Sequence, residues 1–211
     1  MKQRKVGNIL ALAVLAALSR QPMHPYELAS SLRGWGKDQD MEIKWGSLYT
    51  VVRNMDKHGL IEATESVREG KRPERTVYRI TEAGRAELLD WVRELISTAA
   101  PEYPRFKAGL SVVMVLRPDE AISLLQQRLG ELEEQIDKAH ATLAQSAEVP
   151  RLFLIEVEYD LAMKDAEANW MRQLLAEFTS GDFAGMQQWR AFNDTGEVPD
   201  DLAEMAKRHM E

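Results

Sequence analysis

The stretch GSLYTVVRNMDKHGLIE, Gly46–Glu62, predicts an amphipathic helix that ends at a glycine. Its apolar residues recur at helical spacing and form one stripe that faces a core: Leu48, Val51, Val52 and Met55. The helix is expected to end at His58-Gly59, because glycine adopts the left-handed conformation that closes many helices. The opposite face carries polar side chains without an acid among them: Ser47, Tyr49, Thr50, Arg53, Asn54 and Lys57. This face is either an ordinary solvated surface or a surface that reads a ligand.

Two helices are expected before this stretch. The first covers residues 5–19 and is apolar on most sides, so it is expected to lie in a core. Its basic start and apolar run also resemble a secretory signal, but the run is too short to span a bilayer, and a compact pattern follows it. Pro25 suits the first position of a second helix that ends at Gly34. The loop that follows is rich in glycine and aspartate, with a short strand expected at residues 41–44.

A β-hairpin and a fourth helix are expected after the stretch. Residues 60–67 and 76–80 are the two strands, and the charged turn REGKRPER joins them. Thr81 is suited to be the N-cap of the fourth helix, which runs to about residue 98. Three helices followed by a hairpin with a basic loop is the order of a winged helix-turn-helix.

The second half of the chain predicts long helices. Residues 104–116 form either a short helix or a strand, with the helix favoured, and Pro118 begins a long helix. That helix carries a seam with alternating spacings of three and four: Ile122, Leu125, Leu129, Leu132, Ile136, Ala139 and Leu143. The seam packs against a second chain, against the second long helix at residues 152–178, or in part against both. We assign its first five residues, Ile122, Leu125, Leu129, Leu132 and Ile136, to dimerisation.

The expected fold is therefore mostly α, with an N-terminal winged helix-turn-helix of three helices and a β-hairpin wing, followed by an α-helical C-terminal dimerisation domain. The predicted boundaries are residues 1–100 for the DNA-binding domain and 101–180 for the helical domain. Residues 181–211 are predicted to be a tail with a short helix.

Charge is unevenly distributed along the chain. The net charge is −7, yet residues 1–90 hold 15 Lys and Arg against 12 Asp and Glu, and the remaining residues hold 12 against 22. The basic excess thus lies in the half that contains the polar helix face, and an acidic second half does not cancel a local basic patch because salt screens charges over about 10 Å. The chain has no cysteine, which excludes disulfides and cysteine nucleophiles and fits a reducing cytoplasm.

No enzyme motif is present in the sequence. There is no G-x-S-x-G, Walker A or full G-x-G-x-x-G pattern. The histidines do not have the spacing of a metal site: His24, His58, His140 and His209. We therefore expect no catalytic residue, no metal and no cofactor.

A winged helix-turn-helix gives the polar helix face a specific interpretation. Its third helix enters the major groove, where Arg53 can donate to guanine and Asn54 can pair with adenine. Four side chains of the same helix suit phosphate oxygens: Ser47, Tyr49, Thr50 and Lys57. Three cations of the wing add affinity that does not depend on sequence: Lys71, Arg72 and Arg75. The alternative is a winged helix used for protein–protein assembly, which the acidic pI of 5.3 supports.

Three segments in order resemble the PadR family of bacterial transcriptional regulators: HPYELASSL, WGSLYTVVRNMDKHGLIE and GKRPERTVYRITEAGRAEL. The resemblance covers residues 9–89, and residues 104–178 resemble more loosely the helical dimerisation domain of the longer members. Pro25 stands where many members have glycine, and Glu74 beside Arg75 makes the wing less cationic.

The resemblance implies a cytoplasmic, repressor-like homodimer on a palindromic operator in double-stranded DNA, with no membrane partner. It also implies that DNA affinity responds to a small hydrophobic or aromatic effector, or to another signal. Trp91, on the fourth helix, is either a wall of an effector cavity or a core residue, and the core is the commoner place for a tryptophan among leucine and valine.

Overall fold

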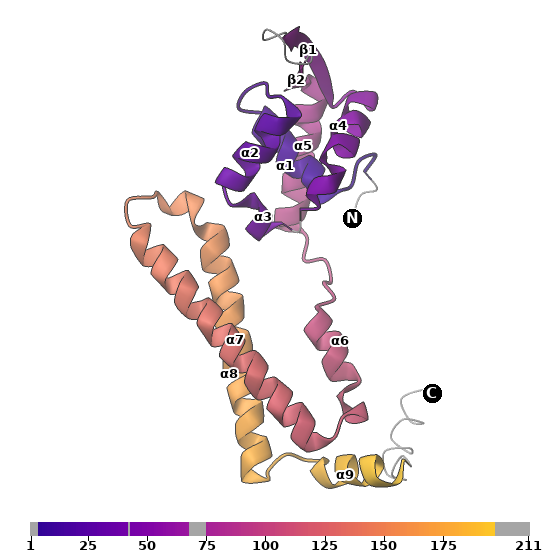
Figure 1. Cartoon of the computed structure of the whole chain (residues 1–211), viewed down its shortest axis with the longest axis vertical. Coiled ribbons are helices and arrows are strands. Elements are labelled where there is room, and N and C mark those ends of the chain that lie inside the picture. The colour runs from indigo at the N-terminus through magenta and orange to yellow at the C-terminus, as the bar shows by residue number, and fades with distance from the viewer. Residues whose placement is uncertain (1–3, 42, 68–74, 197–211) are drawn as a thin grey trace. The chain divides into compact units, whose positions relative to one another are not determined.

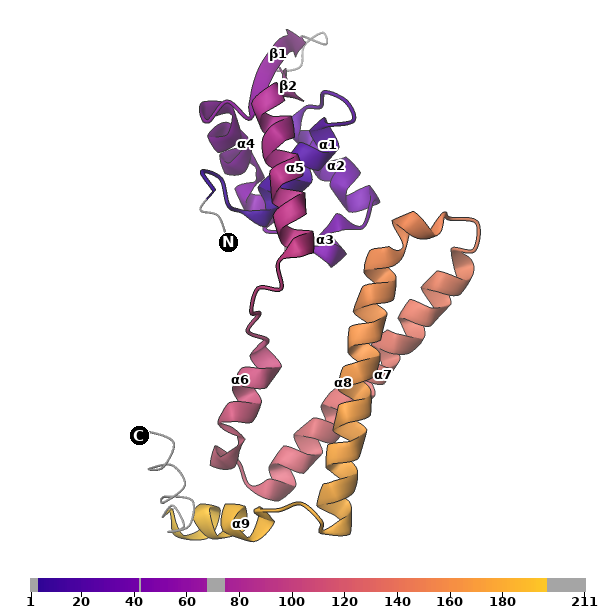
Figure 2. The same cartoon turned by 180° about the vertical axis from the view of Figure 1, so that it is seen from behind.

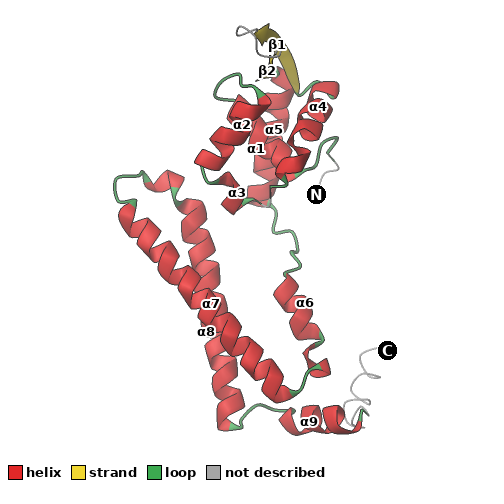
Figure 3. Ribbon diagram, viewed as in Figure 1, coloured by secondary structure: helices red, strands yellow, loops and turns green. Residues whose placement is uncertain are grey.

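The structure is a computed structural model that describes residues 4–41, 43–67 and 75–196 (Figure 1). The chain divides into two compact units, Met1–Glu102 and Tyr103–Glu211. Each unit has its own apolar core. Helices dominate both units, and the two strands form one antiparallel hairpin in the first (Figure 3).

Unit 1 contains the predicted helices and hairpin, plus two short helical segments. Its elements are α1 Ile9–Leu18, α2 Pro25–Gly34, α3 Lys37–Asp40, a 3-10 turn Trp45–Ser47, α4 Leu48–Lys57, β1 Ile61–Val67, β2 Arg75–Ile80 and α5 Glu82–Ser97. The predicted strand at residues 41–44 is wrong, since none of the described residues there lies in a strand. The apolar side chains of this loop, Met41 and Ile43, pack against the core instead of pairing with a strand.

Helix α1 forms the centre of unit 1, as its sequence predicts. It begins at Ile9, later than expected, because the side chain of Asn8 accepts a hydrogen bond from the Leu10 amide at 2.9 Å and caps the helix. Nearly every residue from Leu10 to Leu18 is buried. Helices α2, α4 and α5 and strand β2 all pack on α1, and Figure 2 shows α5 in front of the other helices of this unit.

The junction between α4, β1 and α5 is held by backbone contacts. Gly59 ends α4 with φ +71°, and the Leu60 amide then donates to the carbonyl of Met55 at 2.9 Å. Thr81 caps α5, since its Oγ1 accepts from the Gly84 amide at 3.0 Å and donates to the carbonyl of Gly59 at 2.7 Å. A Cβ on Gly84 would lie 2.0 Å from the Leu60 carbonyl oxygen, so only glycine fits there.

The hairpin is anchored to the helices that precede it. β1 pairs with β2 from Ile61 opposite Ile80, with a register irregularity between Ala63 and Glu65. Met23, in the turn before α2, exchanges two backbone hydrogen bonds of 3.0 Å with Tyr78 of β2. The base of the wing and the start of α2 are therefore parts of one rigid unit.

Unit 2 is helical in its described residues. Its elements are α6 Arg105–Ser111, a 3-10 turn Val113–Val115, α7 Pro118–Gln145, a 3-10 turn Arg151–Phe153, α8 Ile155–Ser180 and α9 Met186–Thr195. Figure 1 shows α7 and α8 as the long paired helices of this unit. Pro118 begins α7, and Asp119 and Glu120 follow in its first turn, where acids favour a helix start. No helix in the described part of the chain is long and apolar enough to cross a membrane.

The seam of α7 packs against α8 of the same chain. Leu125, Leu132 and Ile136 are buried in one cluster with residues of α8: Leu161, Ala168 and Met171. Exposed ion pairs join the same two helices, with Arg128 Nη2 2.7 Å from Oε1 of Glu167 and Arg172 Nη2 2.7 Å from Oε1 of Glu133. The heptad pattern thus describes an intramolecular helix pair.

Candidate nucleic-acid interface

The outward face of α4 has the predicted polar character. Its apolar stripe is buried in the core of unit 1, and this burial fixes which side chains point to solvent: Tyr49, Thr50, Arg53, Asn54 and Lys57. Tyr49 is 54% exposed although it is aromatic. Asp56 is also exposed on this helix, so one acid accompanies the cations.

Ser47 differs from the other predicted contacts. It is half-buried at the N-cap of α4, and its hydroxyl donates to the carbonyl of Lys44 at 2.7 Å. The hydroxyl hydrogen is therefore engaged within the chain. Ser47 shapes the start of α4, whereas the five exposed residues remain free of that constraint.

Stacked arginines on aromatic rings, which the sequence did not indicate, lie in the helix-turn-helix. The guanidinium of Arg33, in the last turn of α2, lies 4.3 Å from the ring centroid of Trp45, which begins the 3-10 turn before α4. Arg20 stacks on Trp35 at 4.9 Å in the same way. Stacking on a ring orients a guanidinium without neutralising its charge. Arg33 is thus a further cation held beside the start of α4. The sequence does not predict its contact with Trp45, because a loop that includes the short helix α3 separates the two residues.

The wing is described only at its base. Lys71 and Arg72 lie outside the described residues, and Arg75 begins β2 with its side chain outside them as well. Lower on the hairpin, Arg79 Nε donates to Oε1 of Glu62 at 2.7 Å across the two strands. Both side chains of this pair are about half exposed.

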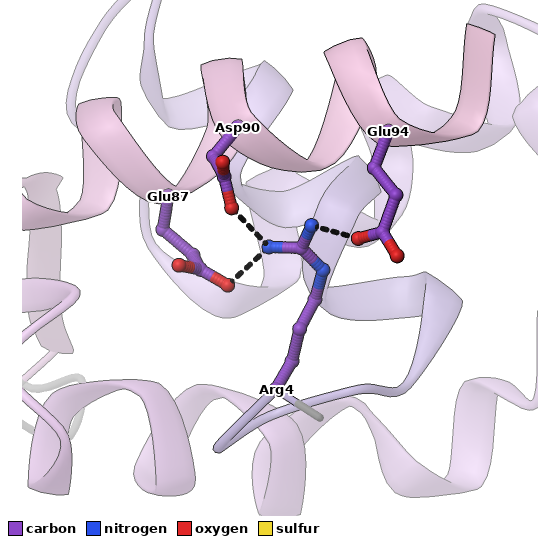
Figure 4. A network of polar contacts seen from close by, with 4 residues as sticks. All are labelled: Arg4, Glu87, Asp90 and Glu94. Atoms are coloured by element: carbon purple, nitrogen blue, oxygen red, sulfur yellow. Dashed lines mark hydrogen bonds and ion pairs between the residues drawn. The ribbon is translucent and has the colours of Figure 1, made fainter. Parts of the chain in front are cut away.

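Trp91 lies in the core of unit 1 and is 3% exposed. The guanidinium of Arg4 lies 5.0 Å from its ring centroid, and Arg4 is held by three acids of α5 (Figure 4): Glu87, Asp90 and Glu94. Burial by itself would lower the pKa of Arg4, but the hydrogen bonds and charges of Glu87 and Glu94 raise that pKa above its ordinary value. These contacts match the core interpretation of Trp91, because its ring is 3% exposed and the Arg4 guanidinium of the same unit lies over it.

The residues predicted for dimerisation are largely used inside the chain. Leu125, Leu132 and Ile136 are covered by α8, and Leu129 packs on the same cluster. A different line of apolar side chains on α8 is exposed: Ile155, Tyr159, Met163 and Trp170. Their spacings of four, four and seven place them on one stripe. The buried part of the α7 seam is thus covered by α8, whereas this stripe is exposed.

Unit 1 is a winged helix-turn-helix. It has three helices around an apolar centre, α1, α2 and α4, and the last of these has a polar outward face with the hairpin packed beside it. Residues 14–90 match the model of the transcriptional regulator PadR-like family. The N-terminal unit is therefore similar to the PadR-like family over these residues.

A probable transcriptional regulator of Mycobacterium tuberculosis is 32% identical over 93 residues, which cover 42% of this chain and 46% of that protein. The match thus spans about half the length of that curated relative.

Solved structures share the fold over most of the chain. Bacillus subtilis PadR in complex with operator DNA has a TM-score of 0.66 at 18% identity, covering 81% of this chain and 99% of that one. The same protein in complex with p-coumaric acid gives 0.65 at 17%, covering 82% and 99%. The Vibrio cholerae virulence activator AphA gives 0.63 at 21%, covering 81% and 98%. At these identities the likeness shows a common fold.

Proposed function

We propose that this protein is a sequence-specific DNA-binding regulator whose helix α4 enters the major groove. The observation that carries the proposal is the exposed pair Arg53 and Asn54 on a helix whose opposite stripe is buried. Because the apolar stripe of α4 is buried in the core, the helix cannot rotate about its axis. Arg53 and Asn54 are therefore presented to solvent together, at a fixed spacing. Arginine donates bidentately to guanine and asparagine pairs with adenine, so both can read base edges.

The surrounding cations would position the protein on the DNA backbone. Lys57 and the stacked Arg33 are exposed near opposite ends of α4. Phosphate contacts from such groups set register and supply affinity that does not depend on sequence. Lys71, Arg72 and Arg75 of the wing take the same role in this proposal. The B. subtilis PadR complex with operator DNA supports it, since that protein shares this fold and binds DNA.

The proposal includes a homodimer on a palindromic operator. One winged helix reaches a single half-site of a few base pairs, and a two-fold dimer presents two reading helices about 34–36 Å apart or a multiple of that. We assign the dimer contact to the exposed stripe of α8 that includes Tyr159 and Met163, which are 67% and 54% exposed. Large exposed apolar side chains in a row mark surfaces that a partner covers.

Regulation is proposed to be repression relieved by a small hydrophobic or aromatic effector in the cytoplasm. A dimer seated on an operator that overlaps a promoter blocks polymerase without any further activity. The complex of B. subtilis PadR with p-coumaric acid supports an effector of this class. The sign of regulation is tested separately, because a protein of the same fold is named a virulence activator.

Fluorescence anisotropy with DNA from upstream of the protein's own gene tests the function. We expect saturable binding that a scrambled duplex of the same composition competes at least a hundredfold less well. Equal competition by both duplexes would instead favour a winged helix that serves protein assembly. A promoter fusion in a deletion strain tests the sign, since loss of a repressor raises expression.

A further inference from the structure

Unit 2 contains an apolar pocket of about 370 Å³. Its walls come from α6, the following 3-10 turn, α7, α8 and α9, and four of its lining residues are aromatic: Trp170, Phe178, Phe183 and Trp189. The ring of Phe178 meets the edges of Phe183 and Trp189 at centroid distances of 4.6 and 6.2 Å. Aromatic side chains in such numbers are typical of sites for small molecules.

The indole N–H of Trp189, in the pocket wall, and the side-chain amide of Asn193, on the same helix, are both paired with the backbone. Trp189 is 4% exposed, and its Nε1 donates to the carbonyl of Leu116 at 2.9 Å. Asn193 donates from Nδ2 to the carbonyl of Met114, also at 2.9 Å. These bonds hold α9 against the 3-10 turn Val113–Val115 and the residue that follows it. Because Trp189 directs its N–H to the backbone, its ring offers the pocket carbon atoms only.

Charge is absent from the residues that line the pocket in the described part of the chain. The adjoining hollow shares Leu110 and Trp170 with the pocket and is lined by three cations and one acid: Arg105, Lys107, Arg128 and Glu167. Arg128 donates to Glu167 at 2.7 and 2.8 Å and stacks on Phe106 at 4.0 Å, so this ion pair balances its own charge. An anion in the apolar pocket would lose its water without gaining a cation from the walls of that pocket, which is costly. The walls therefore select a neutral molecule.

The size of the pocket sets the size of the molecule. An apolar cavity of about 150 Å³ stays dry and binds a single benzene ring. A pocket of about 370 Å³ is more than twice as large and accommodates two fused or linked rings. Void space of this kind leaves the lining atoms without contacts on one side, and a ligand of matching shape restores them.

We propose that this pocket of unit 2 is a binding site for a neutral, apolar molecule with two aromatic rings. Binding itself follows from the walls of the pocket, whereas its effect on DNA affinity rests on the function proposed above. The site lies in unit 2, far along the chain from Trp91, which the core of unit 1 covers.

The full-length protein is titrated with 6-propionyl-2-(dimethylamino)naphthalene, a neutral probe with two fused rings whose fluorescence rises in apolar sites. Leu174→Trp fills the pocket, because Leu174 is one of its walls, and Leu174→Asn makes the same wall polar with the same number of side-chain heavy atoms. Leu124→Trp is the matched control, since Leu124 is 48% exposed on α7 and is not a wall of this pocket. Circular dichroism and melting curves verify that each variant is folded.

We expect one probe per chain, at least tenfold weaker binding in both Leu174 variants, and unchanged binding in Leu124→Trp. The anionic 5-(dimethylamino)naphthalene-1-sulfonate, which has the same two fused rings, should bind at least tenfold more weakly than the neutral probe. Equal binding by all four proteins, no binding by the wild type, or tighter binding of the anion would each overturn the proposal. A second chain filling the pocket would appear as absent probe binding together with a Leu174→Trp variant of altered oligomeric state.

The failure of this proposal is separable from failure of the proposed function. Saturable probe binding by a protein that does not recognise operator DNA would overturn the regulator and leave the pocket assignment standing. Specific DNA binding by a protein that takes no probe would overturn the pocket alone.

Discussion

Arg4 donates a hydrogen bond of 2.6 Å from Nη1 to Oε1 of Glu87, a residue 83 positions later in the chain. Its second nitrogen, Nη2, donates to Glu94 at 2.5 Å, and Asp90 lies 3.3 Å from Nη1. The three acids lie on one face of α5, because they are spaced by three and four residues. Arg4 therefore fastens the segment before α1 to α5 (Figure 4).

Replacing this guanidinium should destabilise unit 1. Arg4→Met leaves Glu87, Asp90 and Glu94 facing one another, and we expect a loss of about 2 kcal/mol in the free energy of unfolding. This is below the roughly 3–5 kcal/mol for a fully buried pair, because the carboxylates keep partial contact with water. Urea denaturation measures the change. Arg93→Met, at an exposed position of the same helix, is the control and should change stability little. Equal stabilities of the two variants would contradict a structural role for Arg4.

Base recognition should depend on α4. Arg53→Ala or Asn54→Ala is expected to cost about 1–3 kcal/mol in operator affinity and to relax preference at particular base pairs. Both side chains are exposed, so folding should be unaffected. Anisotropy against a panel of single-base operator variants measures the effect. If Arg53→Ala left both affinity and base preference unchanged, the assignment of α4 as the reading helix would be wrong.

The wing should behave differently from α4. Lys71→Ala or Arg72→Ala is expected to weaken binding to all sequences alike and to reduce the slope of log K against log salt by about 0.9 for each lost phosphate contact. The measurement is operator affinity at several salt concentrations. Selective loss of preference at one base pair would instead place the mutated residue against a base.

Dimerisation should depend on the exposed stripe of α8. Met163→Glu puts a charge on this stripe, and we expect it to shift the protein from dimer to folded monomer at micromolar concentration, since a buried unpaired charge is costly. Gln126→Glu, on an exposed position of α7 outside the stripe, is the matched control. Sedimentation velocity distinguishes the species. A wild type that sediments as a stable folded monomer would refute the dimer altogether.

Trp91 should act on stability and not on ligand binding. Trp91→Ala removes a 3% exposed ring from the core of unit 1 and is expected to cost about 3–5 kcal/mol. Probe binding in unit 2 should persist below the lowered melting temperature. Selective loss of ligand response at full stability would return Trp91 to the role of an effector contact.

Local chemistry made several elements readable from the sequence alone. The periodicity of Leu48, Val51 and Met55 specifies a buried stripe, and this stripe determines which side chains of α4 face solvent. Pro25 and Thr81 mark helix starts because a fixed φ and a capping hydroxyl act within a few residues. The order of three helices and a hairpin followed from such local signals, so the winged helix could be predicted.

Only the tertiary structure shows which apolar surfaces of the chain pack against each other. An apolar seam such as that of Leu125 and Leu132 shows that something packs on it, but burial is non-directional, and α8 of the same chain proved to be the partner. The same holds for Trp91, whose place in the core of unit 1 depends on contacts with distant segments. Arg4 and α5 meet across more than 80 residues, and the pocket beside Trp189 exists only because α6, α8 and α9 converge. Sequence periodicity shows which face of each helix is apolar. Which of several apolar faces pack against one another depends on how their shapes fit in three dimensions.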